Sequence, residues 1–305
     1  MSSASPTIRT LGVDDLAAFE AEVARARSAG ELRGSSDPGG SVLVDQLRHG
    51  VVEAPGAFDA SGALVGFVSP EVKAVVVRPD HRRRGVGRAL IDAAEGVERR
   101  RGRAQVIMGV TPDDASGLAF LRATGFAYHS TLWDLELPAD AAVPEPAWPA
   151  GCVARSFERD RDGRDWIILF NAAFADHATP LQIDLEPALA EPPDPRFVDA
   201  DTHLLADAVT GRLLGFCATT PEREDGVVGP SAEIWTIGVR PSEQGRGLGR
   251  QLLRWGIQRL RGLGVSDVHL SVNSMNEGAL GLYEREGFRR VRTRERWSRP
   301  VSAPG

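Results

Sequence analysis

The chain has 305 residues, a length that suits two domains of about 150 residues better than one. Its formal net charge is -6, whereas a general nucleic-acid binder is usually strongly basic. Apolar residues make up 42% of the sequence and charged residues 26%, a balance typical of packed domains with a soluble surface. We therefore expect no nucleic-acid partner.

Cysteine, histidine and apolar patterns exclude several other classes. Cys152 and Cys217 are too few and too far apart for a disulfide framework or a metal site. The six histidines form no cluster with the spacing of metal ligands. The N-terminus lacks the layout of a signal peptide, and no apolar run reaches about 18 residues. We expect a cytoplasmic protein with no metal and no membrane partner.

An internal repeat decides the architecture. Residues 71–92 align without a gap with residues 233–254 at an offset of 162, and 9 of 22 positions are identical. The same offset carries Gly125-Phe126 onto Gly287-Phe288. Such self-similarity at a fixed period indicates a duplicated structural unit. Two copies of one fold are therefore expected.

The stretch between the copies is rich in proline, at positions 138, 144, 146 and 149. Proline-rich segments with few bulky apolar residues are usually semi-rigid spacers. We therefore predict an N-terminal domain at residues 1–137, a linker at 138–150 and a C-terminal domain at 151–305.

The second copy shows its elements most clearly. A strand at residues 213–218 precedes a β-rich segment at 234–239, a glycine-rich turn and an amphipathic helix that Gly262 or Gly264 ends. A strand at 268–272 and a second helix through Leu280 follow. Strand, turn, helix and strand form a βαβ unit, so the two strands should be parallel.

The first copy is shorter in the stretch that precedes its repeated segment, residues 71–92. Phe216 precedes Glu233 by 17 positions, whereas the matching Phe67 precedes Glu71 by only 4. The first copy therefore lacks 13 residues there, and its central hairpin should be truncated.

The glycine-rich turn of the second copy, Q-G-R-G-L-G at residues 244–249, lies between a strand and a helix N-terminus. Unpaired N–H groups and the positive end of the helix dipole meet at such a place and favour an anion. Glycines let the backbone approach a diphosphate, and Arg246 and Arg250 add charge at the rim. A loop without a ligand is the alternative. A dinucleotide-binding fold would need G-x-G-x-x-G and a later acidic residue, and the spacing does not match.

The longer pattern is V-R-P, two residues, R/Q-x-x-G-x-G and R, and it occurs in both copies. It resembles the acetyl-CoA-binding motif of the GNAT superfamily of N-acetyltransferases. The resemblance implies an α/β (α+β) protein with two tandem GNAT folds. Each would have a mixed, mostly antiparallel twisted sheet, flanking helices and a βαβ acetyl-CoA-binding unit. Acetyl-CoA would be the acyl donor.

By resemblance, backbone groups of the strand pair with the pantetheine arm of the donor, and the glycine turn holds its diphosphate. In the second copy these positions, together with an asparagine after the next strand, are Ile237, Val239, Gln244, Gly245, Arg246, Gly247, Leu248, Gly249, Arg250 and Asn276. In the first copy they are Val75, Val77, Arg82, Arg83, Arg84, Gly85, Val86, Gly87 and Arg88.

Acyl transfer from a thioester to an amine requires removal of a proton from the amine, polarisation of the carbonyl and protonation of the thiolate. Glu233 opens the strand beside the expected thioester and is the candidate general base, acting through water. A solvated glutamate at a strand start is the alternative. Tyr283 lies in N-E-G-A-L-G-L-Y, which resembles the GNAT segment whose tyrosine protonates the thiolate. A core tyrosine with a capped hydroxyl is the alternative.

The first copy departs at the position of the acid. Leu121 stands where the second copy has Tyr283, and Asp114 stands where it has Asn276. A leucine cannot donate a proton. We therefore predict that the first copy is catalytically weak or inert and binds CoA structurally.

The acceptor should lie beside the segment N-A-A-F-A-D-H, which contains Phe174 and His177 and is expected at the end of the first helix of the second copy. Trp235, two residues from Glu233 on one strand face, could line the same pocket. Core packing of Trp235, and a helix C-terminal pair of Asp176 and His177, are the alternatives.

The tandem layout and the N-A-A-F-A-x-H segment resemble the mycothiol synthase family, which acetylates the cysteinyl amine of a glucosaminyl-inositol conjugate. The residues after His177 and the strand around Phe216 depart from that family's pattern. Three functions follow: acetylation of a small-molecule amine, acetylation of a peptide or protein, and a CoA-binding sensor without turnover. We expect a small-molecule amine as partner and a monomer or homodimer.

Overall fold

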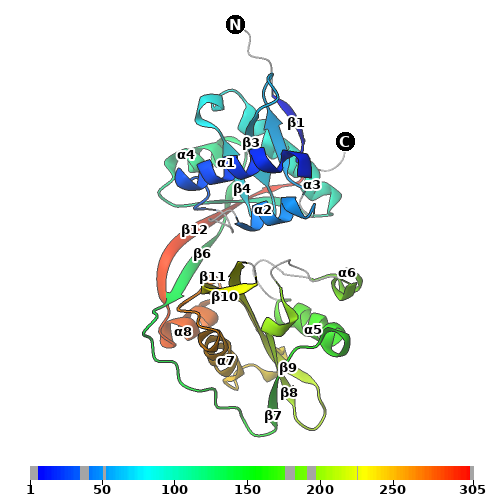
Figure 1. The fold of residues 1–305 in the computed structure, drawn as a ribbon, viewed down its shortest axis with the longest axis vertical. Coiled ribbons are helices and arrows are strands. Elements are labelled where there is room, and N and C mark those ends of the chain that lie inside the picture. The colour runs from blue at the N-terminus through cyan, green and yellow to red at the C-terminus, as the bar shows by residue number, and fades with distance from the viewer. Residues whose placement is uncertain are drawn as a thin grey trace. The chain divides into compact units, whose positions relative to one another are not determined.

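The computed structural model describes residues 6–34, 41–50, 53–175, 183–190, 197–224 and 226–302. Two compact units make up the chain (Figure 1). Unit 1 comprises Met1–Leu132 and Thr293–Gly305, and unit 2 comprises Trp133–Arg292. These units differ from the division expected from the proline-rich stretch. Residues 138–150 belong to unit 2, and the end of the chain belongs to unit 1.

Unit 1 contains a small antiparallel sheet in the order β1-β2-β3-β4 between two layers of helices. Its strands are β1 (Thr7–Thr10), β2 (Pro55–Phe58), β3 (Leu64–Ser69), β4 (Ala74–Val77) and β5 (Gln105–Val110). Its helices are α1 (Leu16–Ser28), α2 (Ser41–Arg48), α3 (Val86–Arg100) and α4 (Ala115–Ala123), with 3-10 turns at Val13–Asp15 and Pro79–His81. Phe67 of β3 packs with α1 and α2, whereas the adjacent Val68 packs with α3. The alternating side chains of β3 thus join both helix layers to one sheet.

Unit 2 has a larger sheet in the order β6-β11-β10-β9-β8-β7. Its own strands are β7 (Cys152–Ser156), β8 (Thr202–Asp207), β9 (Leu213–Glu224), β10 (Val227–Val239) and β11 (Asp267–Asn273). Its helices are α5 (Arg159–Ala173), α6 (Leu185–Ala190), α7 (Leu248–Gly262) and α8 (Glu277–Arg285), with 3-10 turns at Asp199–Asp201 and Pro241–Glu243. β10 and β11 are parallel and flank α7, which confirms the predicted βαβ unit.

Two strands pass from one unit to the other. β6 (Ala127–Leu137) begins in unit 1 and ends in unit 2, and β12 (Arg289–Pro300) begins in unit 2 and ends in unit 1 (Figure 1). Within unit 1, Glu295 to Pro300 of β12 pair antiparallel with β5. The last strand of the chain therefore completes the unit that contains its first residues.

The central hairpin differs between the units as predicted. β3 and β4 have 6 and 4 residues, whereas β9 and β10 have 12 and 13. The 13 residues that the first copy lacks are therefore removed from the hairpin that precedes the glycine-rich turn.

The predicted amphipathic helix is α7. Its apolar stripe, which includes Leu252, Ile257 and Leu260, is buried against the sheet. Burial of each such side chain contributes about 1.5 to 3 kcal/mol. The helix ends at Gly262 with Leu263 as its C-cap. Gly264 follows with φ of 86°, and the N–H of Val265 donates a hydrogen bond to the Leu260 carbonyl at 3.1 Å. This is a Schellman ending, which requires a residue that tolerates positive φ.

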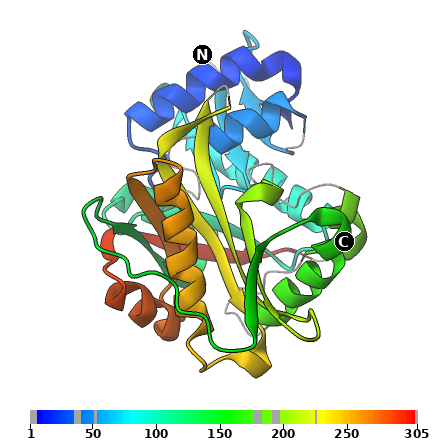
Figure 2. The same ribbon diagram turned by 60° about the horizontal axis from the view of Figure 1, so that its bottom comes forward.

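The proline-rich segment 138–150 is attached along the outside of α7 instead of being a free spacer (Figure 2). Trp148 packs edge-on against Trp255, with 5.5 Å between ring centroids. Three further links are hydrogen bonds from Arg261 to the Pro138 carbonyl (3.0 Å), from Gln258 to the Val143 carbonyl (2.8 Å) and from the Ala147 N–H to Gln251 (2.8 Å). The contacts recur along one stripe of α7, so this strap of residues 138–150 runs antiparallel to the helix.

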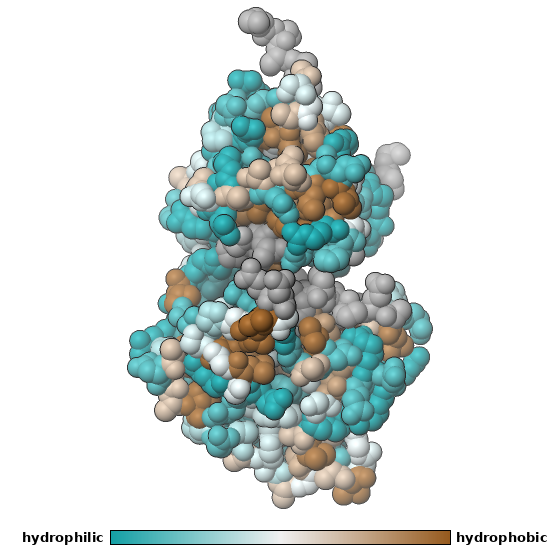
Figure 3. Space-filling model, in the orientation of Figure 1, coloured by the Kyte–Doolittle hydropathy of each residue, from teal (hydrophilic) through white to brown (hydrophobic). Residues whose placement is uncertain are grey.

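On the described part of the face in Figure 3, hydrophobic residues form small groups separated by hydrophilic ones. Among the described residues, no helix combines the length and apolar character needed to span a bilayer.

Candidate active site

The parallel ladder between β10 and β11 ends early. Ser231, Ala232 and Glu233 pair with Asp267, Val268 and His269, and no later pair joins the two strands in the described structure. β10 nevertheless continues to Val239 and β11 to Asn273. The edge of β10 from Ile237 to Val239 therefore faces β11 without a ladder. Such an open strand edge can pair with an extended ligand.

A β-bulge lies in the same part of β10. The register with β9 shifts between Ile234 and Thr236, so Trp235 is the extra residue. Ile234 packs into the core beside α7, whereas Trp235 packs on the other face with Phe170 of α5. Glu233 shares the α5 face with Trp235, as the alternation of the strand predicts. Contrary to the sequence expectation, Glu233 lies in the middle of β10 and does not open it, because the strand starts at Val227.

The glycine-rich turn follows directly on the open edge. Gly245 and Gly247 both have φ of 78°, and Gly247 is the N-cap of α7 without a side-chain cap. A Cβ added at either glycine would meet no atom within 4 Å. The space beside these two glycines is therefore open in the described structure, at a helix N-terminus whose unpaired N–H groups favour an anion.

The arginines of this turn are paired with carboxylates. Arg246 forms an ion pair with Glu243, which also binds Arg212 at 2.7 Å, and Arg250 lies 3.2 Å from Glu286. The hydrogen bond from Arg246 holds the pKa of Glu243 below its usual range. Neither Arg246 nor Arg250 is therefore an unopposed positive charge at this turn.

Tyr283 lies in α8, half-buried beside the core of α7, with its ring 6.0 Å from that of Phe288. Burial raises the pKa of Tyr283 to about 12, and the neighbouring Cys217 adds to the shift. Its hydroxyl makes no hydrogen bond to any described residue. The phenol therefore stays protonated near neutral pH and has a proton to donate.

Asn276 has a role in the fold that the sequence analysis missed. Its side-chain oxygen caps α8 by accepting a hydrogen bond from the Ala279 N–H at 3.1 Å. Asp114 caps α4 of unit 1 in the same way through the Gly117 N–H at 2.9 Å. The residue types at these two positions could have predicted the caps, since asparagine and aspartate are preferred helix N-caps. The exchange of one for the other between the copies preserves the cap.

Aromatic side chains cover the α5 face beside Glu233. Phe174, the C-cap of α5, packs on Phe170 at 4.8 Å, and Phe170 stacks 6.3 Å from Trp235. Asn171 fixes the neighbouring chain by two hydrogen bonds with the backbone of Ile183, at 2.8 and 3.0 Å. Phe174 and Trp235 remain partly exposed and border this face, whereas His177 lies outside the described residues.

Unit 1 retains the turn. Arg83 and Gly85 have φ of 60° and 84°, matching Gly245 and Gly247 at the same offset. Arg82 donates to the Val77 carbonyl at 2.8 Å and contacts Glu31 at 2.5 Å.

At the positions that correspond to Glu233 and Tyr283, unit 1 differs from unit 2. Glu71 forms an ion pair with Arg101, and Leu121 is buried. Lys73 takes the place of Trp235, and burial lowers its pKa to about 8.

Gly34 packs closely against β5 of unit 1. The Gly34 carbonyl accepts a hydrogen bond from Arg296 at 3.0 Å, and a Cβ at Gly34 would come within 2.4 Å of Val110 in β5. The backbone of Gly34 therefore lies directly against β5.

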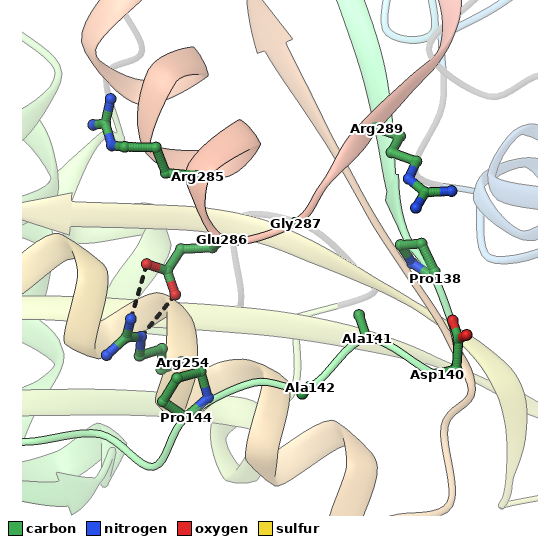
Figure 4. Close-up of a pocket in the computed structure, with 10 residues that line it drawn as sticks. All are labelled: Pro138, Asp140, Ala141, Ala142, Pro144, Arg254, Arg285, Glu286, Gly287 and Arg289. Carbon is green, nitrogen blue, oxygen red and sulfur yellow. Dashed lines mark hydrogen bonds and ion pairs between the residues drawn. The ribbon is translucent and has the colours of Figure 1, made fainter.

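A cavity of about 480 Å³ lies elsewhere in unit 2, between the strap, α7, the end of α8 and the start of β12 (Figure 4). Arg254 donates two hydrogen bonds to the carboxylate of Glu286, at 2.7 and 3.0 Å. The guanidinium groups of Arg285 and Arg289 point apart. No common anion site is built there, and neither Glu233 nor Tyr283 lines this cavity. Among the described residues, no group of three or more His, Cys, Asp or Glu is placed to hold a metal ion.

Residues 51–126 and 164–288 match the acetyltransferase (GNAT) family. The chain belongs to this family. The mycothiol acetyltransferase of Thermomonospora curvata is 38% identical over 217 residues, which are 71% of this chain and 69% of that protein. The mycothiol acetyltransferase of Parafrankia sp. is 32% identical over an alignment of 323 residues that covers 96% of this chain and 98% of the relative.

Solved structures show the same fold. A GCN5-related N-acetyltransferase from Sphaerobacter thermophilus has a TM-score of 0.69 at 22% identity, with 98% of this chain and 96% of that chain covered. A tandem GNAT protein from the clavulanic acid biosynthesis pathway has a TM-score of 0.66 at 18% identity, with 98% and 100% covered. The prediction of a GNAT acyltransferase built from two tandem copies is thereby confirmed.

Proposed function

We propose that unit 2 transfers the acetyl group of acetyl-CoA to a primary amine of a small molecule by direct attack. The observation that carries this proposal is the end of the β10–β11 ladder at Glu233. From that point an open strand edge leads through Ile237 and Val239 to the glycine-rich turn. A ligand with a peptide-like arm and a diphosphate suits these two features together.

The donor supplies an activated thioester, and this chain supplies its binding. Backbone groups of Ile237 and Val239 would pair with amides of the pantetheine arm. The N–H groups of residues 245–250 would hold the diphosphate at the start of α7. Asn276 and Gln244 would border the arm, although the side-chain oxygen of Asn276 already caps α8.

Glu233 and Tyr283 have complementary roles in this proposal. Glu233 would take the proton of the attacking amine through water, and Tyr283 would protonate the departing sulfur. A phenol with a pKa of about 12 is a weak acid, but burial raises the basicity of a thiolate formed beside it as well. Cys217, a thiol in the same core, has its pKa raised to about 12 by burial.

Unit 1 would bind the donor without turning it over. The turn from Arg82 to Arg88 keeps its shape, with Val75 and Val77 before it. The base position, Glu71, is neutralised by Arg101, and the acid position is Leu121.

The acceptor would lie on the face that Phe174 and Trp235 border. Cysteinyl-glucosaminyl-inositol is the first acceptor to test, because the curated relatives are named mycothiol acetyltransferase. A peptide acceptor and a sensor without turnover are the competing functions.

The test is release of free thiol from acetyl-CoA by the full chain with a panel of amines: the cysteinyl conjugate, polyamines, aminoglycosides and short peptides. Saturable release with one small amine, lost in Glu233→Gln, supports the proposal. A preference for peptides names the competing enzyme. Binding of acetyl-CoA without release for any amine overturns the proposal in favour of the sensor.

A further inference from the structure

His269 is the direct neighbour of Glu233 across the parallel strands β10 and β11. Adjacent strands lie about 4.8 Å apart, and paired residues of a parallel ladder project to the same face. The pair is the last rung of the ladder, so both side chains stand where the strands begin to separate. Nothing in the sequence next to residue 269 marks His269 as a functional residue.

The orientation of His269 follows from its neighbours. Val268, Leu270 and Val272 belong to the core beside α7, so His269 and Ser271 face the opposite side, which is the α5 side of the sheet. His269 is half-buried, and no hydrogen bond joins it to a described residue. The imidazole therefore lies on the face that carries Glu233 and Trp235.

The charged and polar groups around this imidazole come from each flanking strand. β10 contributes Glu233, and β9 places Thr220 opposite Glu233. On the other flank, β6 contributes Asp134, which accepts a hydrogen bond from Ser271 at 2.7 Å and is ion-paired with Arg292. Four further acidic residues belong to the same strands: Glu136 of β6, Asp267 of β11, and Glu222 and Glu224 of β9. Above β10, α5 contributes aromatic groups instead of charges.

Unit 1 provides an internal comparison. At the offset of 162, Ile107 occupies the position of His269, and Leu121 occupies that of Tyr283. The titratable group beside the base is therefore absent from the same copy that lacks the proposed acid. A purely structural need for histidine at this strand position would apply to both copies, since both have β5 or β11 there.

We propose that His269 acts through Glu233 as the positioning and proton-relay residue of the acceptor site. This inference rests on the acetyl transfer proposed above. Glu233 takes the proton, and His269 accepts it from Glu233 and passes it to solvent. An imidazole is suited to this step because it changes charge near neutral pH, whereas a carboxylate is a poor proton store there.

The proton balance is complete without another reactant. The acceptor ammonium gives one proton to the Glu233–His269 pair and becomes a free amine. Its nitrogen forms the bond to the thioester carbon, the carbon–sulfur bond breaks, and the sulfur takes the proton of Tyr283. The second proton of the attacking nitrogen leaves through the same pair, and Tyr283 is reprotonated. The net products are the amide, the thiol and one proton.

The test compares His269→Gln, His269→Asn and the wild-type full chain over pH 5.5 to 9.5, with the amine that the wild type acetylates. Glutamine and asparagine keep a hydrogen bond but do not titrate. We expect kcat to fall about 10- to 100-fold in both variants, with the KM for acetyl-CoA unchanged. The acidic limb of the kcat/KM profile should change shape as well. His49→Asn, at the exposed end of α2, is the matched control and should behave as wild type.

A double variant separates coupling from simple proximity. If Glu233 and His269 act as one relay, Glu233→Gln/His269→Asn should lose no more activity than the worse single variant. If the fold-loss of activity in the double variant equals the product of the two single fold-losses, the inference is overturned. So does a wild-type pH profile in both His269 variants, provided that acetyl-CoA binding shows them folded. A wild-type chain that acetylates no amine overturns the proposed function instead.

Discussion

Arg83 in unit 1 has the left-handed backbone conformation of Gly245 in unit 2, 162 positions further along the chain. Left-handed backbone costs a residue with a side chain about 1 to 2 kcal/mol, and glycine far less. Unit 1 therefore keeps the shape of the turn even where its sequence has lost the residue that adopts that shape most easily. Strain retained in this way is common where a loop has a ligand to hold.

Replacement of Gly245 by alanine tests the turn of unit 2. A Cβ there meets no atom within 4 Å, so the variant should fold, with a loss of about 1 to 2 kcal/mol from the positive φ. We expect the KM for acetyl-CoA to rise several-fold while kcat is retained. Gly211→Ala is the matched control, because Gly211 has φ of 72° and equally open surroundings in the β8–β9 turn. Equal donor KM values in the two variants would contradict a diphosphate site at Gly245.

Removal of the Tyr283 hydroxyl tests the proposed acid. Tyr283→Phe keeps the ring packed on Phe288 and should lower kcat about 100-fold without weakening donor binding. Because burial raises the pKa of Tyr283 to about 12, the wild-type rate should not fall through ionisation of this phenol below about pH 10. The other tyrosine of the chain, Tyr128, is exposed, and Tyr128→Phe is the control. Unchanged kcat in Tyr283→Phe would exclude the acid role.

His203 predicts a pH dependence of stability in unit 2. It is buried against Trp255, and burial lowers its pKa to about 4, with Arg259 adding to the shift. The unfolded chain therefore binds a proton that the folded chain resists between about pH 6.5 and pH 4. Stability is present above this window and is lost as the pH falls through it, by up to about 3 kcal/mol.

The measurement is urea unfolding at pH 7 and pH 5, followed by tryptophan fluorescence. His203→Phe keeps an aromatic ring beside Trp255 and should show a smaller difference between the two pH values than the wild type. His49→Gln, at an exposed position, should keep the wild-type difference. A pH difference in His203→Phe as large as in the wild type would assign the effect to other groups.

The strap of residues 138–150 should detach when its hydrogen bonds are removed. Gln258→Ala leaves the Val143 carbonyl without its donor, and Gln251→Ala removes the acceptor of the Ala147 N–H. Each change should cost about 1 kcal/mol, and the double variant about twice as much. Limited proteolysis within the strap should accelerate in the double variant. Gln105→Ala in β5 is the control, and cleavage of the double variant at the wild-type rate would show that the prolines and Trp148 suffice.

Local patterns predicted those parts of the structure that depend on local interactions. The repeat located both glycine-rich turns, and the stripe of Leu252, Ile257 and Leu260 located α7, which ends at Gly262, one of the two glycines expected to end it. The 13-residue difference before Glu71 predicted the short hairpin of unit 1. The comparison of the two copies spans 162 positions, but within each copy these inferences need only periodicity, turn residues or segment length over about 20 positions.

Relationships between distant residues could not be predicted in this way. The pairing of His269 with Glu233 depends on strand register, and the ion pair of Glu71 with Arg101 depends on how α3 packs. The attachment of the strap to α7 was also hidden, because prolines indicate a spacer whether or not its carbonyls find donors. Register and packing are fixed only once the whole sheet has formed.

The pairing of β12 with β5 has a consequence for the order of folding on the ribosome. In unit 1, β5 is synthesised long before residues 295–300 of β12, with which it pairs. At a synthesis rate of about 5 to 20 residues per second, that delay is on the order of ten seconds or more. During this time β5 has an exposed backbone edge, which nascent chains and chaperones can reach. Unit 1, most of which is translated before unit 2, is therefore the last to complete its strand pairing.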